Sequence, residues 1–217
     1  MNTLPFALYH GTSSLFLESI MTQGLGAERP VLQHSVIEMI AKMVDAFEAR
    51  FPMNKEWMDY SWFAKRMVAN EDGQRFSFRY GGGAYYSVCP GRALGFARKR
   101  HGSEAISALV ELHEILHRLA PDLADSIYPC DHDLREFLAQ PASPVILKVS
   151  RIDKGDLRAE NGGPIGETLD YMTEIFFMKS KGVQAVQREQ TNFECLAVVP
   201  PEHIEVFHAD RIAELFV

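Results

Sequence analysis

The residues best suited to chemistry lie in short segments far apart in the sequence. The first is Tyr9-His10-Gly11-Thr12-Ser13, in which a glycine follows a histidine. Because glycine has no Cβ, its backbone can approach a flat ring closely. Much further along, Tyr85 precedes Phe96 by eleven positions. Two aromatic faces suit a planar, electron-poor ring through stacking and cation–π attraction.

A carboxylate lies near the start of a third segment, Asn192-Phe193-Glu194-Cys195-Leu196-Ala197-Val198-Val199-Pro200. Glu194 opens an apolar run that leads to a proline-containing turn, which is typical of a strand and its end. A carboxylate stabilises the positive charge that develops on a sugar when its glycosidic bond breaks. That chemistry would suit a site that separates a sugar from a charged ring.

In this order, the three segments resemble the signature blocks of the ADP-ribosyltransferase superfamily, most closely its H-Y-E branch of diphtheria-type toxins and poly-ADP-ribose polymerases. The resemblance implies that His10 holds the adenine ribose 2′-hydroxyl and that the Gly11 backbone grips the nicotinamide carboxamide. Tyr85 and Phe96 would clamp the nicotinamide, while Glu194 would polarise its ribose. It thus assigns catalysis to Glu194, His10 and Tyr85, and NAD⁺ binding to His10, Gly11, Thr12, Ser13, Tyr85, Tyr86 and Phe96.

A protein of this kind would consume NAD⁺ as a substrate and transfer ADP-ribose to a macromolecular acceptor, either protein, RNA or DNA. Small stand-alone bacterial members are toxins, injected effectors or anti-phage defence enzymes, so we also expect a restraining antitoxin or a chaperone partner. No metal is expected. A catalytically inactive binding module on the same fold is an alternative.

Two positions depart from the family pattern. Ala93 stands where polymerase-like members place a serine that binds the carboxamide. Asn192 replaces the first glutamate of the E-x-E motif found in arginine-modifying toxins, which argues against arginine as the acceptor. RNA 2′-phosphotransferases share a similar H-G-T opening but need an H-x-H strand where this chain has Tyr85-Tyr86-Ser87, so they fit less well.

A zinc-dependent chemistry is an alternative. His113-Glu114-Ile115-Leu116-His117 is an H-E-x-x-H string in a segment with helical periodicity. On a helix the two histidines share a face and could bind Zn²⁺, with Glu114 as general base in a metallopeptidase. Charged Glu111 and Arg118 flank the string, and the spacing shows no third ligand. The available candidates for a third ligand are Asp131, His132, Asp133 and Glu136.

Hydrophobic periodicity and turn residues predict the elements that must position these groups. We expect strands near residues 7–10 (broken by Gly11), 75–80, 84–88, 144–152, 182–187, 193–199 and 204–208. We expect helices near residues 14–23, 31–50, 54–70, 92–100, 103–119, 133–138 and 168–179, with loop over the rest of 120–143.

Strands and helices that rarely form βαβ units favour an α+β fold. With the resemblance, we expect one ADP-ribosyltransferase-like domain over residues 1–217, a split β-sheet core with helical insertions at about 30–75 and 103–140. The net charge of −7 argues against a passive nucleic-acid coat, although Arg92, Arg98, Lys99, Arg100 and His101 form a basic cluster.

Targeting signals are not evident in the sequence. The 3 cysteines lack the C-x-x-C spacing of zinc knuckles and are odd in number, so a reducing compartment is the simplest expectation. No basic and apolar leader and no run long enough to span a membrane is present, and we expect a cytoplasmic protein without membrane contact.

Overall fold

The protein has an α+β fold, and the computed structural model describes residues 3–28, 30–69, 83–160, 165–177, 191–208 and 210–216. Within these ranges, an antiparallel sheet of six strands has the order β4-β5-β2-β1-β3-β6. The strands are β1 (Leu8–Ser13), β2 (Ala84–Ser87), β3 (Pro144–Val149), β4 (Leu157–Ala159), β5 (Asn192–Cys195) and β6 (Ile204–His208).

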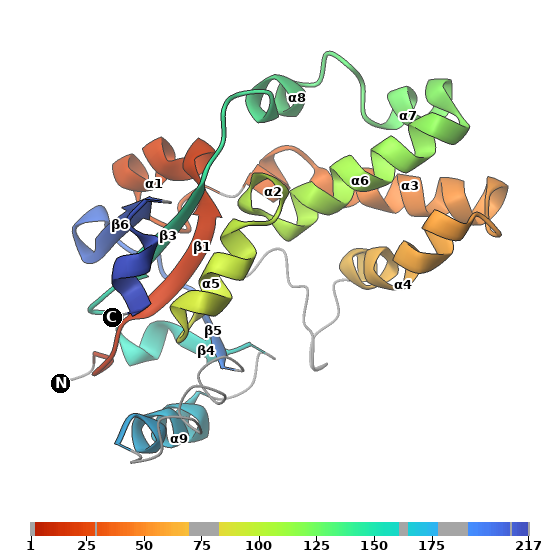
Figure 1. Ribbon diagram of the computed structural model, residues 1–217. Helices are drawn as coiled ribbons and strands as arrows, with labels where there is room; N and C mark the ends of the chain where they lie inside the picture. Colours follow the sequence, from red (N-terminus) through yellow and green to blue (C-terminus); the bar gives the residue numbers. More distant parts are fainter. Residues whose placement is uncertain are drawn as a thin grey trace.

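Helices of the described ranges gather mainly beside the sheet, where α3, α4, α6 and α7 lie together, while α9 lies apart from them (Figure 1). The helices are α1 (Leu17–Gln23), α2 (Pro30–Gln33), α3 (Val36–Arg50), α4 (Lys55–Ala69), α5 (Pro90–Ala97), α6 (Glu104–Leu119), α7 (Pro121–Ile127), α8 (Asp133–Leu138) and α9 (Gly166–Phe177). Short 3-10 turns are η1 (Ser14–Phe16), η2 (Arg100–Gly102), η3 (Lys154–Asp156), η4 (Pro201–His203) and η5 (Ile212–Phe216).

Apolar periodicity explains why the helices form a layer with its own core. The buried face of α3 includes Ile40, Met43 and Phe47, which belong to one hydrophobic cluster with Leu109 and Leu112 of α6. Burying each such side chain contributes about 1.5–3 kcal/mol. The segments expected as insertions thus pack against one another, while a second cluster holds the sheet, α1 and α9 together.

The centre of the sheet is where its two halves diverge. Strand β1 pairs with β3 along its whole length, from Leu8↔Val149 to Ser13↔Pro144. Its pairing with β2 is limited to Tyr9↔Ser87. Beyond that pair, the edge of β1 that faces β2 does not pair with a strand of the described residues.

Most expected elements are confirmed where the structure describes them, notably α4, α6, α8, β2 and β6. The helix expected over 31–50 is confirmed over most of its length but is divided into α2 and α3, because Ser35 adopts a left-handed conformation with φ 50°. The strand break at Gly11 is wrong, since Gly11 pairs with Ile146 inside β1. The expected strands at 75–80 and 182–187 lie outside the described residues.

Candidate functional site

A cavity of about 330 Å³ opens at the divergence of β1 and β2 and brings together most of the predicted site residues. Its walls come from β1, β2, α1, the segment after α1, Phe96 of α5 and the start of α6. The volume lies at the lower end of the range for small-molecule sites. The predicted residues that line it are His10, Gly11, Thr12, Tyr85, Tyr86 and Phe96.

His10 bridges the gap between the two halves of the sheet. Its Nδ1 lies 2.8 Å from the backbone oxygen of Tyr85. A carbonyl oxygen can only accept, so Nδ1 carries the proton and Nε2 of the neutral ring keeps a lone pair. Burial lowers the pKa of His10 below its ordinary value, and the hydrogen bond to the Tyr85 carbonyl opposes that shift. The site therefore holds a neutral imidazole with a fixed tautomer.

Tyr85 and Glu194 occupy opposed positions on β2 and β5. Directly opposed residues of an antiparallel pair project from the same face of the sheet. The Glu194 side chain is fully buried, and its Oε1 accepts the backbone N–H of Gly83 at 2.7 Å. Glu194 does not line the cavity in this conformation, whereas Gly83 and Tyr85 do.

The packing of α5 against β1 explains why position 11 is a glycine. A Cβ built at Gly11 would lie 1.8 Å from the carbonyl oxygen of Ala93, so only glycine lets α5 approach β1 this closely. Ala93 is buried in a small cluster with Ile146 and Phe207 and does not line the cavity. Ala93 therefore serves to pack α5 against the sheet.

Phe96 presents its ring to the cavity with cations around it. The Arg92 guanidinium carbon lies 5.1 Å from the ring centre, and Lys99 Nζ lies 5.6 Å from it. Lys99 also forms an ion pair with Glu104. Phe96 and Tyr85 both line the cavity, so the predicted pair of rings shares one site.

Ser13 takes a different position from the other residues of its segment. It is buried, does not line the cavity, and its Oγ accepts the backbone N–H of Leu15 at 3.3 Å. It therefore caps η1 at the point where the chain leaves β1. Thr12, one residue earlier, is also buried but does line the cavity.

Acidic residues that sequence reasoning missed also line the cavity. Glu28 accepts hydrogen bonds from Ser19 and Gln23. Glu160 Oε2 accepts the amide N–H of Asn192 at 3.0 Å. Among the described lining residues there is no Lys or Arg. A lone glutamate in a loop carries no spacing signal, so the sequence offered no means of finding them.

The histidines of the H-E-x-x-H string lie on α6, as predicted, but only His113 is packed into the protein. His113 is buried and its Nε2 lies 2.7 Å from a guanidinium nitrogen of Arg135. Glu114 Oε1 lies 2.6 Å from Arg100 instead of near the histidines. The lone pair that would bind zinc therefore faces a cation, and the carboxylate that would activate water is paired elsewhere.

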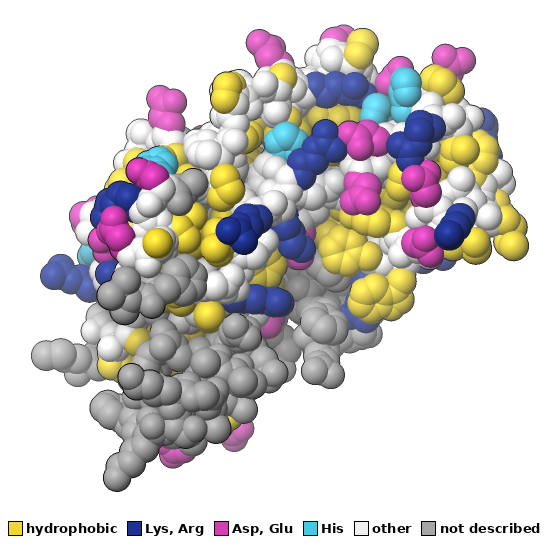
Figure 2. Space-filling view, viewed as in Figure 1, with side chains coloured by type: hydrophobic (Ala, Val, Ile, Leu, Met, Phe, Trp, Pro, Cys, Tyr) yellow, Lys and Arg dark blue, Asp and Glu magenta, His cyan; other side chains and the backbone are white. Residues whose placement is uncertain are grey.

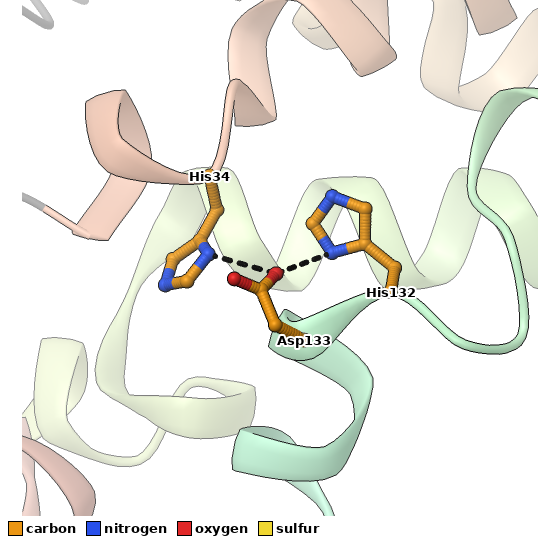
Figure 3. A group of neighbouring side chains, drawn as sticks. All are labelled: His34, His132 and Asp133. Carbon is orange, nitrogen blue, oxygen red and sulfur yellow. Dashed lines mark hydrogen bonds and ion pairs between the residues drawn. The ribbon is translucent and has the colours of Figure 1, made fainter.

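Figure 3 shows His34, His132 and Asp133, a group within the described residues whose atoms could surround a metal ion. His34 Nδ1 lies 3.2 Å from Asp133 Oδ1, and His132 Nδ1 lies 3.0 Å from it. Both His132 Nδ1 and Asp133 Oδ1 also accept the backbone N–H of Leu134. These contacts cap α8 and tie it to the turn between α2 and α3.

Comparisons of the chain with protein-family models, with curated proteins and with solved structures find no match. Within the described ranges, no helix has both the length and the apolar character needed to cross a membrane. Function is therefore inferred from the geometry of the cavity and the residues around it.

Proposed function

We propose that the protein is an NAD⁺-consuming mono-ADP-ribosyltransferase that modifies a macromolecular acceptor. The observation that carries the proposal is the convergence of His10, Tyr85 and Glu194 on the adjacent strands β1, β2 and β5. These residues lie far apart in the sequence, and they are the ones that the resemblance singles out. The divergence of β1 and β2 fits the split sheet expected for an ADP-ribosyltransferase-like core.

The chemistry of the lining supports a dinucleotide substrate at its nicotinamide end. Nε2 of His10 is left to accept a hydroxyl proton, as a ribose 2′-hydroxyl would provide. Tyr85 Oη and Asn192 Oδ1 are buried without a hydrogen-bond partner, although both residues line the cavity. Buried polar atoms of this kind gain from a ligand that completes their bonds.

In the proposed reaction the bond between the nicotinamide nitrogen and C1′ breaks, and the electron pair leaves with nicotinamide. The Glu194 carboxylate would accept the 2′-hydroxyl and stabilise the positive charge at C1′. A nucleophile of the acceptor then bonds to C1′ and releases its proton. Because Glu194 Oε1 accepts the Gly83 N–H in this conformation, substrate binding must move the start of β2 or share that carboxylate.

Detection of free nicotinamide after incubation with NAD⁺ and cell lysate tests the proposal. We expect slow release by the unmodified chain and a fall by a factor of about 10²–10³ in Glu194→Gln. Glutamine keeps an oxygen for the Gly83 N–H, so the fold should be retained. Release by neither protein would favour the inactive binding module, and equal release by both would remove Glu194 from the mechanism.

A further inference from the structure

Within the described residues, buried polar atoms without a hydrogen-bond partner fall into just two places. Unpaired buried donors and acceptors are costly and rare, so each one calls for an explanation. One place is the cavity already described, which Tyr85, Tyr86 and Asn192 line. The other is a groove along α6, which is lined by the remaining three residues with such atoms, namely His101, Tyr128 and Arg135.

This groove, called the α6 groove below, has a volume of about 580 Å³. It lies on the face of α6 that carries Lys, Arg and His side chains interspersed with Asp and Glu (Figure 2). Its lining contains one carboxylate, Glu114, and no Asp. The basic lining residues are Arg100, Arg118 and Arg135, together with His101, His113 and His117.

Arg135 is held in place with part of its donor capacity unused. One of its terminal nitrogens lies 2.7 Å from His113 Nε2, 2.5 Å from the backbone oxygen of Tyr128 and 3.4 Å from Asp125 Oδ1. Its guanidinium carbon also lies 4.5 Å from the centre of the Tyr128 ring. Its Nε and the Tyr128 hydroxyl have no partner, and both can donate.

The arginines of the groove act on the histidines beside them. Burial lowers the pKa of His113, and the charge of Arg135 lowers it further. Burial and then the charge of Arg100 lower the pKa of His101 in the same way. His101 also has a left-handed backbone with φ 58°, which is strained for a residue other than glycine.

The carboxylates in and around the groove are paired. Glu114 binds Arg100 at 2.6 Å, and Glu56 binds Arg118 at 2.7 Å. Asp125 lies 3.4 Å from Arg135 and 3.6 Å from His117. All of these carboxylates are close to half exposed, so an incoming anion can share their cations without leaving a charge buried.

We propose that the α6 groove is a second binding site that takes a phosphate group, presented by a nucleotide or by a nucleic-acid strand. Guanidinium groups match the oxygens of phosphate by geometry, and the spare donors of Arg135 and Tyr128 would complete its coordination. The site is separate from the NAD⁺ proposal and does not depend on it. It also gives His113 and His117 a role that involves no metal.

Calorimetric titration with inorganic phosphate, adenosine 5′-monophosphate and a short single-stranded DNA tests the site. Tyr128→Phe removes a hydroxyl that has no partner, so we expect the thermal unfolding of the protein to be unchanged or raised. Its affinity for the phosphate ligand should nevertheless fall about tenfold. Arg118→Gln, at the exposed edge, should weaken binding less, and Tyr171→Phe on the exposed surface of α9 is the matched control.

Saturable binding that Tyr128→Phe weakens supports the site, and the tightest of the three ligands identifies the source of the phosphate. Absence of binding by all three would overturn the proposal. So would binding that Tyr128→Phe and Arg118→Gln leave at full strength, because the ligand would then lie elsewhere, as in the first cavity.

Discussion

The imidazole of His10 reaches across the divergence of β1 and β2 to donate a hydrogen bond to the backbone oxygen of Tyr85, over 2.8 Å. This contact joins the two halves of the sheet at the point where their ladder stops after Tyr9↔Ser87. The same side chain therefore links the two strands and lines the cavity. The ring therefore has a structural role, in addition to the binding role proposed for it.

Substitution of His10 should separate these two roles. We expect His10→Ala to lose both the Tyr85 contact and Nε2, and to weaken NAD⁺ binding about tenfold or more. In His10→Gln, the side-chain amide can still donate to the Tyr85 carbonyl. Relative to His10→Ala, this variant should therefore regain stability to a greater extent than it regains NAD⁺ affinity. Calorimetry with NAD⁺ and chemical denaturation of both variants measure the two effects. Equal affinity of His10→Ala and the unmodified chain for NAD⁺ would contradict the assignment.

Stability should fall as the solution becomes mildly acidic. The pKa values of His10, His101 and His113 all lie below the ordinary value of 6.5, mainly because burial disfavours their charged forms. Below that value the unfolded chain binds protons that the folded chain does not, so the free energy of unfolding decreases with falling pH. Each histidine contributes at most about 1.4 kcal/mol per pH unit.

Urea denaturation at about pH 7.5 and about pH 5.5 measures this dependence. We expect His10→Gln and His113→Gln each to reduce the difference between the two conditions. The exposed His208→Gln is the control and should leave it unchanged. If the difference in unfolding free energy between the two pH values is the same in the unmodified chain and the three variants, these histidines do not set the acid sensitivity.

Sequence reasoning worked best where one periodic pattern decided an element. The apolar stripe of α6 predicted its helix closely. His10, Tyr85 and Glu194, which come from three separate motif segments, lie on the neighbouring strands β1, β2 and β5. Sequence reasoning failed at Ser35, where a single left-handed residue divides a periodic segment. Such a residue changes the path of the chain without changing its hydrophobic pattern.

Spacing rules could not predict contacts between polar side chains that lie far apart in the sequence. Nothing in the sequence connects Arg135 with His113, although the two side chains are in contact. Glu160 and Asn192 meet because β4 pairs with β5, and β4 is too short to give a strand signal. Gly11 was predicted as a glycine that contacts a ligand, whereas packing of α5 already requires it.

Gly11, which packs against α5, and Gly95, which lies within it, should respond in opposite ways to the same substitution. Gly11→Ala places a Cβ 1.8 Å from the Ala93 carbonyl oxygen, which forces β1 and α5 apart. We expect a loss of about 3 kcal/mol or more in the free energy of unfolding, together with loss of NAD⁺ turnover. Gly95→Ala meets nothing within 4 Å and lies inside the helix, so it should stabilise the protein by about 0.5–1 kcal/mol.

Thermal unfolding of both variants checks this pair. A change of 1 kcal/mol corresponds to a shift of about 2–4 °C for a chain of this size. If Gly11→Ala unfolds at the same temperature as the unmodified chain, α5 does not pack on β1 as described. Normal unfolding with lost turnover would instead make Gly11 a residue of the ligand site alone.

Substitution of the two histidines in the H-E-x-x-H string distinguishes a zinc site from a packed helix. A zinc site needs both histidines, so His113→Ala and His117→Ala would lose bound metal equally, and a chelator would destabilise the unmodified protein. The structure predicts unequal effects. His113 is buried against Arg135 and Asp125, so His113→Ala should cost about 1–3 kcal/mol. His117 has a side chain that is 48% exposed, and its substitution should change stability by less than about 0.5 kcal/mol. Chelation should alter neither unfolding nor nicotinamide release, whereas one zinc per chain and matched losses in the two variants would establish the metal site.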